Sequence, residues 1–382
     1  MSDGPIRFVQ PNLPSAANVY DNYGSRFWPS KVGEDFQAIL ESGMVSNAEW
    51  CRKVEGWATS NLGAKHAVAV SSCTSGLQLA ARILGKAGMR SVLPSWTWIS
   101  TGLAAMESGM KPMFVDIDPA TLTAKDMAAG LKMHEGAVRI LPNVFGVDAD
   151  LKREQTDAET RGDPLIIDAA HAIASKYHGQ PVGGFGDCAV FSLSPSKFAT
   201  GGEGGIVTTN DPELADLLRA YRDVGGVDRA CHYPGMNAKL SEFNACVAWH
   251  SVQGLGAEVK AREVAGSAYD SAFGEALGEG KLSLQHRPAY NRGSGRQYYP
   301  IILPSVADRA RVEVACADAE IPTRGYYRPA LHQQPMFEGV EAPFGLRNTE
   351  SIGSRVLHLP IHAGISETIA NAIADVVLGG LP

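Results

Sequence analysis

A single lysine stands between an apolar segment and a cluster of glycines. The apolar run 189–191 is typical of a buried strand, and a short polar turn leads from it to Lys197 and to the glycines of 201–205. At the end of a buried strand an ammonium group is partly desolvated, which favours the nucleophilic amine. The glycines would let the backbone pass close to whatever the amine binds. By itself, the segment is equally compatible with a surface lysine in a loop.

An aspartate upstream strengthens the chemical interpretation. The apolar run 165–167 ends at Asp168, as expected for an inner strand of a parallel sheet with a carboxylate at its carboxyl end. Open α/β sheets bind their ligands at that edge. A buried carboxylate there requires a cationic partner, which the ring nitrogen of pyridoxal phosphate would supply while a lysine holds the aldehyde. A helix-capping aspartate is the structural alternative.

A third segment has the pattern of an anion site. The strand-like run 66–70 is followed by the polar turn 71–76, which includes Thr74 and Ser75, and then by a helical stretch to residue 84. A helix N-terminus after such a turn presents free N–H groups and the positive end of the helix dipole. Serine and threonine also cap helices for purely structural reasons, so this signal is weak alone.

Together these motifs resemble those of the DegT/StrS-type sugar aminotransferases, a branch of the fold-type I, aspartate aminotransferase-like enzymes that use pyridoxal phosphate. The resemblance runs from about residue 40 to about residue 360 and rests on the segments 40–47, 72–77, 92–98, 109–118, 168–171, 191–205, 235–242 and 327–332. It implies a large domain with a mostly parallel seven-stranded sheet and a smaller C-terminal α+β domain. We place these domains at 1–255 and 256–382.

The resemblance also implies roles for individual residues around the cofactor. Lys197 would form the Schiff base and later move the proton, and Asp168 would pair with the pyridine nitrogen. Trp98 would stack on the cofactor ring, although a core aromatic residue would be buried in the same way. His171 falls beside the position of the cofactor's ring oxygen.

The remaining implied contacts concern the cofactor's phosphate. Thr74, Ser75 and Ser192 would hold it within one chain. Asn237 resembles a residue that reaches the phosphate across a dimer interface, so the resemblance implies a homodimer with shared active sites. Two features depart from the family pattern. Cys73 stands where many members have glycine, and the stretch 9–28 is longer and more aromatic than usual.

The function implied is transfer of an amino group, from glutamate as the expected donor, onto a keto sugar that is expected to be nucleotide-linked. Two alternatives stay open: a cyclitol ketone as acceptor, and a pyridoxal phosphate-binding regulatory protein without turnover. A sugar dehydratase of the same family would carry histidine in place of the Schiff-base lysine, and Lys197 argues against it.

Composition agrees with a large globular enzyme of two domains: 382 residues, 45% of them hydrophobic. The six cysteines lack CxxC spacing, and Pro360 separates His358 from His362, so we expect no metal site and a reducing, cytoplasmic setting. A formal charge of −7 predicts no nucleic-acid partner. The absence of a long apolar run or an export signal predicts no membrane partner.

The pattern of elements agrees with an α/β fold. Strand-like runs at 66–70, 91–94, 112–116, 138–143, 164–168, 188–193 and 205–209 alternate with helical stretches, which predicts a parallel sheet covered on both faces. Beyond them we predict a helix at 211–221, long helical segments from 241 to about 277, a strand at 297–303, a helix at 306–319 and a final helix from residue 366.

Overall fold

A seven-stranded sheet forms the centre of the molecule in the computed structural model, which describes residues 6–7, 28–128, 131, 136–228 and 230–382. Residues 9–27 of the aromatic stretch 9–28, named above, lie outside these described residues. All the sheet's neighbours pair in parallel except β9, which is antiparallel to both of its neighbours. The order is β1 (His66–Val70), β9 (Gly205–Thr209), β8 (Cys188–Ser192), β5 (Leu165–Asp168), β4 (Ala137–Pro142), β2 (Arg90–Pro94) and β3 (Lys111–Val115). The predicted α/β class and mostly parallel sheet are confirmed.

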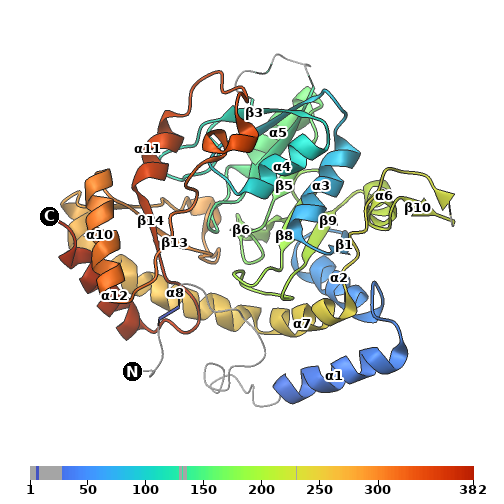
Figure 1. Cartoon of the computed structure of the whole chain (residues 1–382), viewed down its shortest axis with the longest axis horizontal. Helices are drawn as coiled ribbons and strands as arrows, with labels where there is room; N and C mark the ends of the chain where they lie inside the picture. Colours follow the sequence, from blue (N-terminus) through green and yellow to red (C-terminus); the bar gives the residue numbers. More distant parts are fainter. Residues whose placement is uncertain (1–5, 8–27, 129–130, 132–135, 229) are drawn as a thin grey trace.

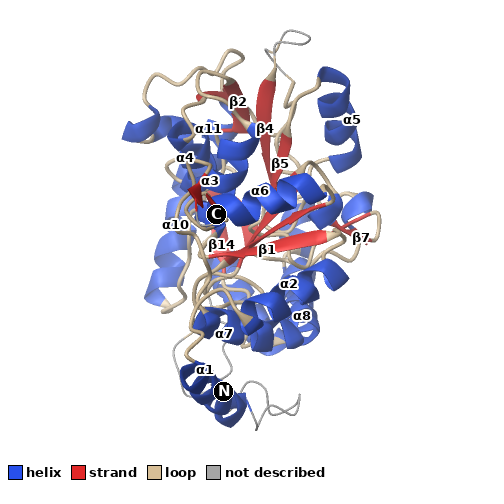
Figure 2. Cartoon of the chain, turned by 90° about the vertical axis from the view of Figure 1, so that its right-hand side faces the viewer, coloured by secondary structure: helices blue, strands red, loops and turns tan. Residues whose placement is uncertain are grey.

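Helices cover both faces of this sheet, as Figure 2 shows. Alternate strand residues point to opposite faces, so Ala67 and Ala69 join one core while Val68 and Val70 join the other. The first core is closed by α2 (Glu49–Asn61), α5 (Leu151–Arg161) and α7 (Glu242–Gln253), and the second by α3 (Cys73–Leu84), α4 (Ile99–Glu107) and α6 (Pro212–Arg222). These two cores fix the carboxyl ends of the strands against one another.

A second, antiparallel sheet lies to one side of the first. In Figure 1 it is found beside the orange helix α10 (Val306–Asp318) and the red helix α12 (Glu367–Gly379). It pairs β12 (Ser283–Leu284) with β13 (Tyr299–Ile302), and β13 with β14 (Val356–Leu359). Its core is closed by α8 (Leu255–Ala272), α10 and α12. The boundary predicted at residue 255 falls at the start of α8 and stays a prediction.

The remaining elements are short or peripheral. They are α1 (Trp28–Ser42), α9 (Gly274–Gly278), α11 (Arg347–Arg355), the hairpins β6 (Lys176–Tyr177) with β7 (Gln180–Pro181) and β10 (Gly226–Val227) with β11 (Ala230–Cys231), and the 3₁₀ turns Val182–Gly184, Ala289–Asn291, Leu331–Gln333 and Pro335–Phe337. The hairpin of β10 and β11 projects beyond α6 at the right of Figure 1.

Several helices begin where the sequence offers a capping side chain. Asp211, Ser305 and Ser366 each accept a hydrogen bond from a backbone N–H in the first turn of the following helix. The predicted starts at 211, 306 and 366 therefore agree with the structure within a residue. The stretch 241–277, predicted to hold long helical segments, forms α7, α8 and α9, with breaks at Gly254 and Phe273.

Helix α2 lacks a capping side chain of its own, and a buried glutamate from α7 takes that role. The two carboxylate oxygens of Glu242 accept hydrogen bonds from the backbone N–H groups of Ala48, Trp50 and Cys51 at 2.8, 2.7 and 3.1 Å. Burial alone would raise the pKa of Glu242, but these bonds and the Cys51 thiol hold it below its ordinary value. Glu242 therefore joins α2 to α7 as an anion.

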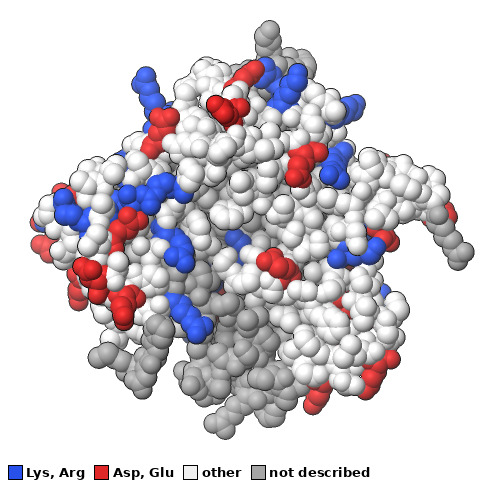
Figure 3. Space-filling model, viewed as in Figure 1, with Lys and Arg blue, Asp and Glu red and all other residues white. Residues whose placement is uncertain are grey.

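The surface carries both kinds of charge. On the face seen in Figure 3, acidic and basic side chains are interspersed, and neither kind forms a broad patch. In the described part of the chain, no helix combines the length and the apolarity needed to cross a membrane.

Replacing Glu242 tests its capping role. Glu242→Gln removes the charge and one acceptor oxygen, so we expect it to lower the free energy of unfolding at pH 7 by about 2 kcal/mol. Because the folded-state pKa is lowered, the parent's advantage is complete above the unfolded value of about 4.3 and is lost as the pH falls through the folded value. The urea midpoints of the parent and of Glu242→Gln should therefore differ at pH 7 and converge only at a pH below the folded-state pKa of Glu242.

The matched control is Glu49→Gln in α2, the helix that Glu242 caps, where the glutamate side chain is 68% exposed and pairs with Lys53. It should leave both midpoints almost unchanged. An equal loss of stability in the two variants, or a loss for Glu242→Gln that does not depend on pH, would contradict the capping role.

Candidate active site

The predicted residues converge on one cavity of about 450 Å³ at the carboxyl ends of the central strands. Strands β5 and β8 are adjacent, with Asp168 paired opposite Val190, so the segment after β8 passes beside Asp168. The cavity lining includes six of the eight residues predicted from the sequence: Lys197, Asp168, Trp98, His171, Thr74 and Ser192. A larger hollow of about 680 Å³ beside α5 contains none of them.

Lys197 is the amine of this cavity. The turn that carries it is held by its own N–H, which donates to the Ser194 carbonyl at 3.1 Å, and by the Gln297 amide, which donates to the Ser196 carbonyl at 2.7 Å. Burial lowers the pKa of Lys197 to about 8, although the charges of Cys73 and Asp168 act in the opposite direction. At pH 7 about a tenth of Lys197 is therefore the neutral, nucleophilic amine, far more than for a lysine of ordinary pKa.

The glycines after Lys197 have a different role from the one expected. A Cβ on Gly201 would lie 2.8 Å from the Asn244 carbonyl oxygen, and one on Gly205 would lie 2.8 Å from the backbone nitrogen of Cys73. Those two glycines therefore let the loop pack on α7 and on the start of α3 rather than on a ligand. This corrects the expectation from the sequence, and it explains how β9 fits against the turn 71–76.

Asp168 is a buried carboxylate that has hydrogen bonds but no adjacent cation. Its side chain accepts from the Thr101 hydroxyl at 2.6 Å and from the Ala170 N–H at 3.2 Å, and the Thr97 hydroxyl lies 3.1 Å from that of Thr101. Burial raises the pKa of Asp168, and both hydrogen bonds oppose the rise. No ion pair of Asp168 is present among the described residues, so a cationic ligand would complete its environment.

His171 is held as a neutral ring. The backbone N–H of Phe145 donates to its Nδ1 at 3.3 Å, so the proton of the neutral imidazole belongs on Nε2. Burial, and then the charges of Lys197 and His358, hold the pKa of His171 well below its usual value. His171 can therefore donate one hydrogen bond to an oxygen in the cavity without bringing a positive charge.

The N-terminus of α3, where the sequence predicts an anion site, lies at the cavity. Ser72 caps the helix by accepting from the Ser75 N–H at 3.0 Å. The N–H groups of Cys73 and Thr74 have no acceptor within the helix because they lie in its first turn. Thr74 also presents a hydroxyl, which lies 2.8 Å from that of Ser100. Ser192, at the end of β8, completes this side.

Two predicted residues lie outside the lining. The Ser75 hydroxyl bonds to Ser72 within the capping box, behind the cavity, which argues against a direct contact with a phosphate. Asn237 is exposed and pairs through its backbone with Asp223. The segment around Asn237 lies beside the start of the turn 71–76, because the Ser71 N–H donates to the Ala238 carbonyl at 2.8 Å. A contact of Asn237 with a second chain stays a prediction.

Aromatic residues also line the cavity. Trp98 precedes α4 and is 53% exposed, which excludes the alternative of a core aromatic. Its ring centroid lies 6.2 Å from that of Tyr326 and 6.5 Å from that of Tyr327. Tyr298 also lines the cavity, with its ring 6.0 Å from the Lys197 amine.

The sequence did not identify Thr101, Tyr298 or Tyr326 as site residues. Thr101 lies inside α4, where a threonine gives no sign of its partner. The two tyrosines come from the second sheet and the loop before α11, so only the packing of that region against the central sheet brings them to the cavity.

An amine of lowered pKa, a buried carboxylate, a neutral histidine donor and a helix N-terminus now lie around one cavity. These groups suit a molecule that has an aldehyde, a basic ring nitrogen, a ring hydroxyl and a phosphate, which is the set of groups of pyridoxal phosphate. The donor set therefore fits that cofactor, and the site is of the class found in aminotransferases.

Comparison with known proteins identifies the family. Residues 30–378 match the model of the DegT/DnrJ/EryC1/StrS aminotransferase family. The chain belongs to this family and is an aminotransferase of the pyridoxal phosphate-dependent class.

Individual relatives agree with the assignment. The chain is 28% identical to the spore coat polysaccharide biosynthesis protein SpsC of Bacillus subtilis (91% of this chain and 95% of SpsC). It is 27% identical to a pleiotropic regulatory protein of Geobacillus stearothermophilus (86% and 88%). The crystal structure of DesI in the presence of its TDP-sugar product is similar, with a TM-score of 0.86 and 26% identity over 99% of this chain and 93% of DesI.

The pKa of Lys197 leads to a direct prediction. In the cofactor-free chain, reductive methylation by formaldehyde and cyanoborohydride should label Lys197 half-maximally near pH 8, whereas ordinary surface lysines titrate near about 10.4. Peptide mass spectrometry across a pH series gives the midpoint. Asp168→Asn should move it to lower pH, because the carboxylate stabilises the ammonium form. A midpoint equal to that of surface lysines would contradict the assignment.

Proposed function

We propose that this chain binds pyridoxal phosphate at the cavity described above and transfers an amino group from glutamate to a nucleotide-linked keto sugar. The observation that carries the proposal is the position of the Lys197 amine in the same cavity as the buried carboxylate of Asp168. The family supplies the reaction type, and the lining supplies the groups that the cofactor requires.

Each residue would act on a different part of the cofactor. Lys197 would hold the aldehyde as a Schiff base, and Asp168 would keep the pyridine nitrogen protonated. His171 would donate to the ring oxygen, Trp98 would stack on the ring, and Thr74, Ser192 and the start of α3 would bind the phosphate. The bound cofactor supplies an electron sink for the carbon that loses its proton. Lys197, with a pKa of about 8, can accept and return that proton near neutral pH.

A sugar acceptor agrees with the rest of the lining and with the relatives. Tyr298, Tyr326 and Tyr327 offer aromatic faces and hydroxyls to a sugar ring. Among the described lining residues, the charged side chains are Lys197, Asp168 and Glu203, so most of the available contacts are hydrogen bonds and apolar surface. SpsC is a polysaccharide biosynthesis protein, and DesI was crystallised with a TDP-sugar product. A cyclitol ketone would make similar contacts and is the alternative acceptor.

A regulatory role is the second candidate, because one relative is a pleiotropic regulatory protein. A protein that only sensed the cofactor would need the anion site and a lysine, but not an amine of lowered pKa beside a buried carboxylate. Turnover separates the two candidates.

The purified chain, saturated with pyridoxal phosphate, should be incubated with glutamate and a panel of nucleotide-linked keto sugars and cyclitol ketones. We expect 2-oxoglutarate and an amino sugar, detected by mass. The Lys197→Ala chain serves as the control. Failure of every donor and acceptor pair in a cofactor-loaded chain would favour the regulatory candidate.

The role proposed for Asp168 predicts a loss of rate. Asp168→Asn cannot hold the ring nitrogen protonated, so kcat should fall at least a hundredfold while the chain stays folded. Thr101→Val should cause a smaller loss, because Thr101 acts only by positioning and stabilising the carboxylate. Thr101→Ser keeps the hydroxyl, so its rate should equal that of the parent. The pH dependence of the bound cofactor's absorbance should likewise be that of the parent in Thr101→Ser and should change in Thr101→Val. Near-normal turnover of Asp168→Asn would remove it from this role.

The shared site proposed for a homodimer predicts complementation. An Asn237→Ala chain and a Lys197→Ala chain should each form poorly active homodimers. In a mixed dimer both changes fall in one site and leave the other intact, so activity should return after subunit exchange. The lost hydrogen bond to an anion should weaken cofactor binding by about 1.5–3 kcal/mol. Inactive mixed dimers, or an active monomer, would contradict the shared site.

A further inference from the structure

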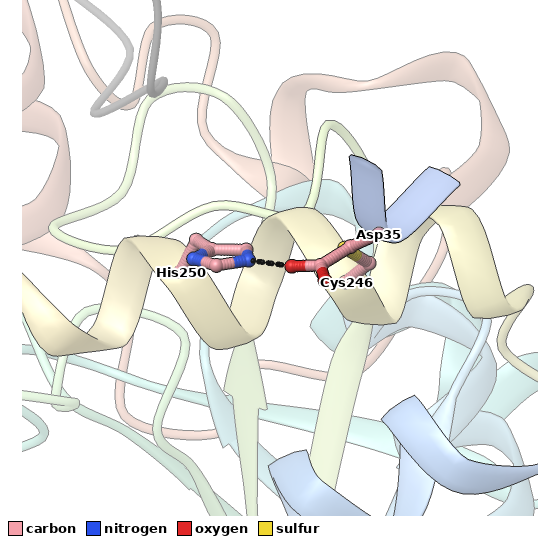
Figure 4. Close-up of side chains that lie close together, drawn as sticks. All are labelled: Asp35, Cys246 and His250. Atoms are coloured by element: carbon pink, nitrogen blue, oxygen red, sulfur yellow. Dashed lines mark hydrogen bonds and ion pairs between the residues drawn. The ribbon is translucent and has the colours of Figure 1, made fainter. Parts of the chain in front are cut away.

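Three potential metal ligands meet where α1 packs on α7, far from the cavity residues in the chain. Cys246 and His250 belong to α7, and Asp35 reaches them from α1 (Figure 4). One thiol sulfur, one imidazole nitrogen and one carboxylate oxygen all lie within 4.8 Å of one another. The sequence has neither CxxC spacing nor a histidine pair that would predict this cluster. Its ligands come together only through the packing of two helices.

The geometry suits a tetrahedral ion. Residues four apart on a helix project from the same face, which brings Cys246 and His250 to one side of α7. The Nε2 atom of His250 lies 2.8 Å from an oxygen of Asp35. Zinc bonds of about 2.0–2.3 Å place tetrahedral ligand atoms about 3.3–3.8 Å apart. The histidine and aspartate would separate by about half an ångström, and the sulfur would move inward, to admit the ion.

The environment favours a cation over an empty cluster. Cys246 is fully buried, and its sulfur has no hydrogen-bond partner among the described residues. The carboxylate of Asp35 lies close to it, and that of Glu242 contributes further negative charge. The opposing charges are Lys31 and Lys53. Lys31 lies 3.6 Å from Asp35 with its side chain 59% exposed, so it can turn into solvent, and the Lys53 amine lies over the Trp50 ring.

We propose that Asp35, Cys246 and His250 bind one divalent cation of the zinc type, with water in the remaining position. A thiolate with an imidazole selects zinc or cobalt over magnesium and calcium, which require oxygen ligands. On binding, the sulfur gives its proton to solvent, the proton of His250 resides on Nδ1, and Nε2 turns its lone pair to the ion. The hydrogen bond between His250 and Asp35 is replaced by two metal bonds.

The ion would link α1 to α7. In the structure, this contact includes the edge-on packing of Phe36 against Phe243, with centroids 5.3 Å apart, and the bond from His250 to Asp35. A cation with one ligand on α1 and two on α7 would add a cross-link between these helices. Binding to the folded chain alone raises its stability by mass action.

Cobalt titration tests the site directly, because tetrahedral Co²⁺ is coloured and a thiolate ligand adds a charge-transfer band. The full chain, saturated with pyridoxal phosphate, freed of any affinity tag and treated with EDTA, should bind one Co²⁺ per chain with that band. Cys246→Ser should abolish the band and weaken binding at least tenfold. Asp35→Asn keeps the side-chain shape and an acceptor for His250, and it should also weaken binding at least tenfold.

The matched control is Cys231→Ser, which removes an exposed thiol in the β10–β11 hairpin and should leave the titration unchanged. Zinc should raise the thermal midpoint of the parent and of Cys231→Ser but not that of Cys246→Ser. The proposal is overturned if the parent binds no cobalt, if Cys231→Ser loses the band, or if Asp35→Asn and Cys246→Ser retain parental affinity. Should Cys246→Ser fail to fold, Asp35→Asn decides between these outcomes.

Discussion

The burial of Asp168 is the constraint on which the site depends. A carboxylate that is 5% exposed and forms hydrogen bonds but no ion pair among the described residues is costly, and its raised pKa expresses that cost. Thr101 and the Ala170 N–H stabilise the anion in part. A protonated ring nitrogen in the cavity would supply the missing charge. Binding of the cofactor would thus offset the cost of burying this group in the sheet.

The same low-polarity surroundings determine the pKa values of the other titratable groups of the cavity. Burial that raises the pKa of Asp168 lowers those of Lys197 and His171, because each shift favours the neutral form. One environment therefore gives a reactive amine, a neutral imidazole donor and a carboxylate in need of a cation. Strands β5 and β8 make this possible, since their adjacent carboxyl ends bring Asp168 and the Lys197 turn together.

Much of this arrangement could be predicted from local sequence. The strands of the central sheet follow apolar runs, and helices such as α6 and α12 begin at capping residues, because both signals act over a few neighbouring residues. Contacts between distant segments could not be predicted in the same way. The glycines of 201–205 were assigned to a ligand, whereas Gly201 and Gly205 accommodate α7 and α3. The contact of Thr101 with Asp168 and the positions of the tyrosines that line the cavity likewise depend on tertiary packing. So does the capping of α2 by Glu242.

The central claim is that Lys197 is the residue that holds the cofactor's aldehyde. The most direct measurement is borohydride reduction of the chain loaded with pyridoxal phosphate, followed by peptide mass spectrometry. The account predicts a phosphopyridoxyl mass on the peptide that contains Lys197 and its absence from the Lys197→Ala chain. A label on a different lysine, or none on a chain that binds the cofactor, would contradict the account.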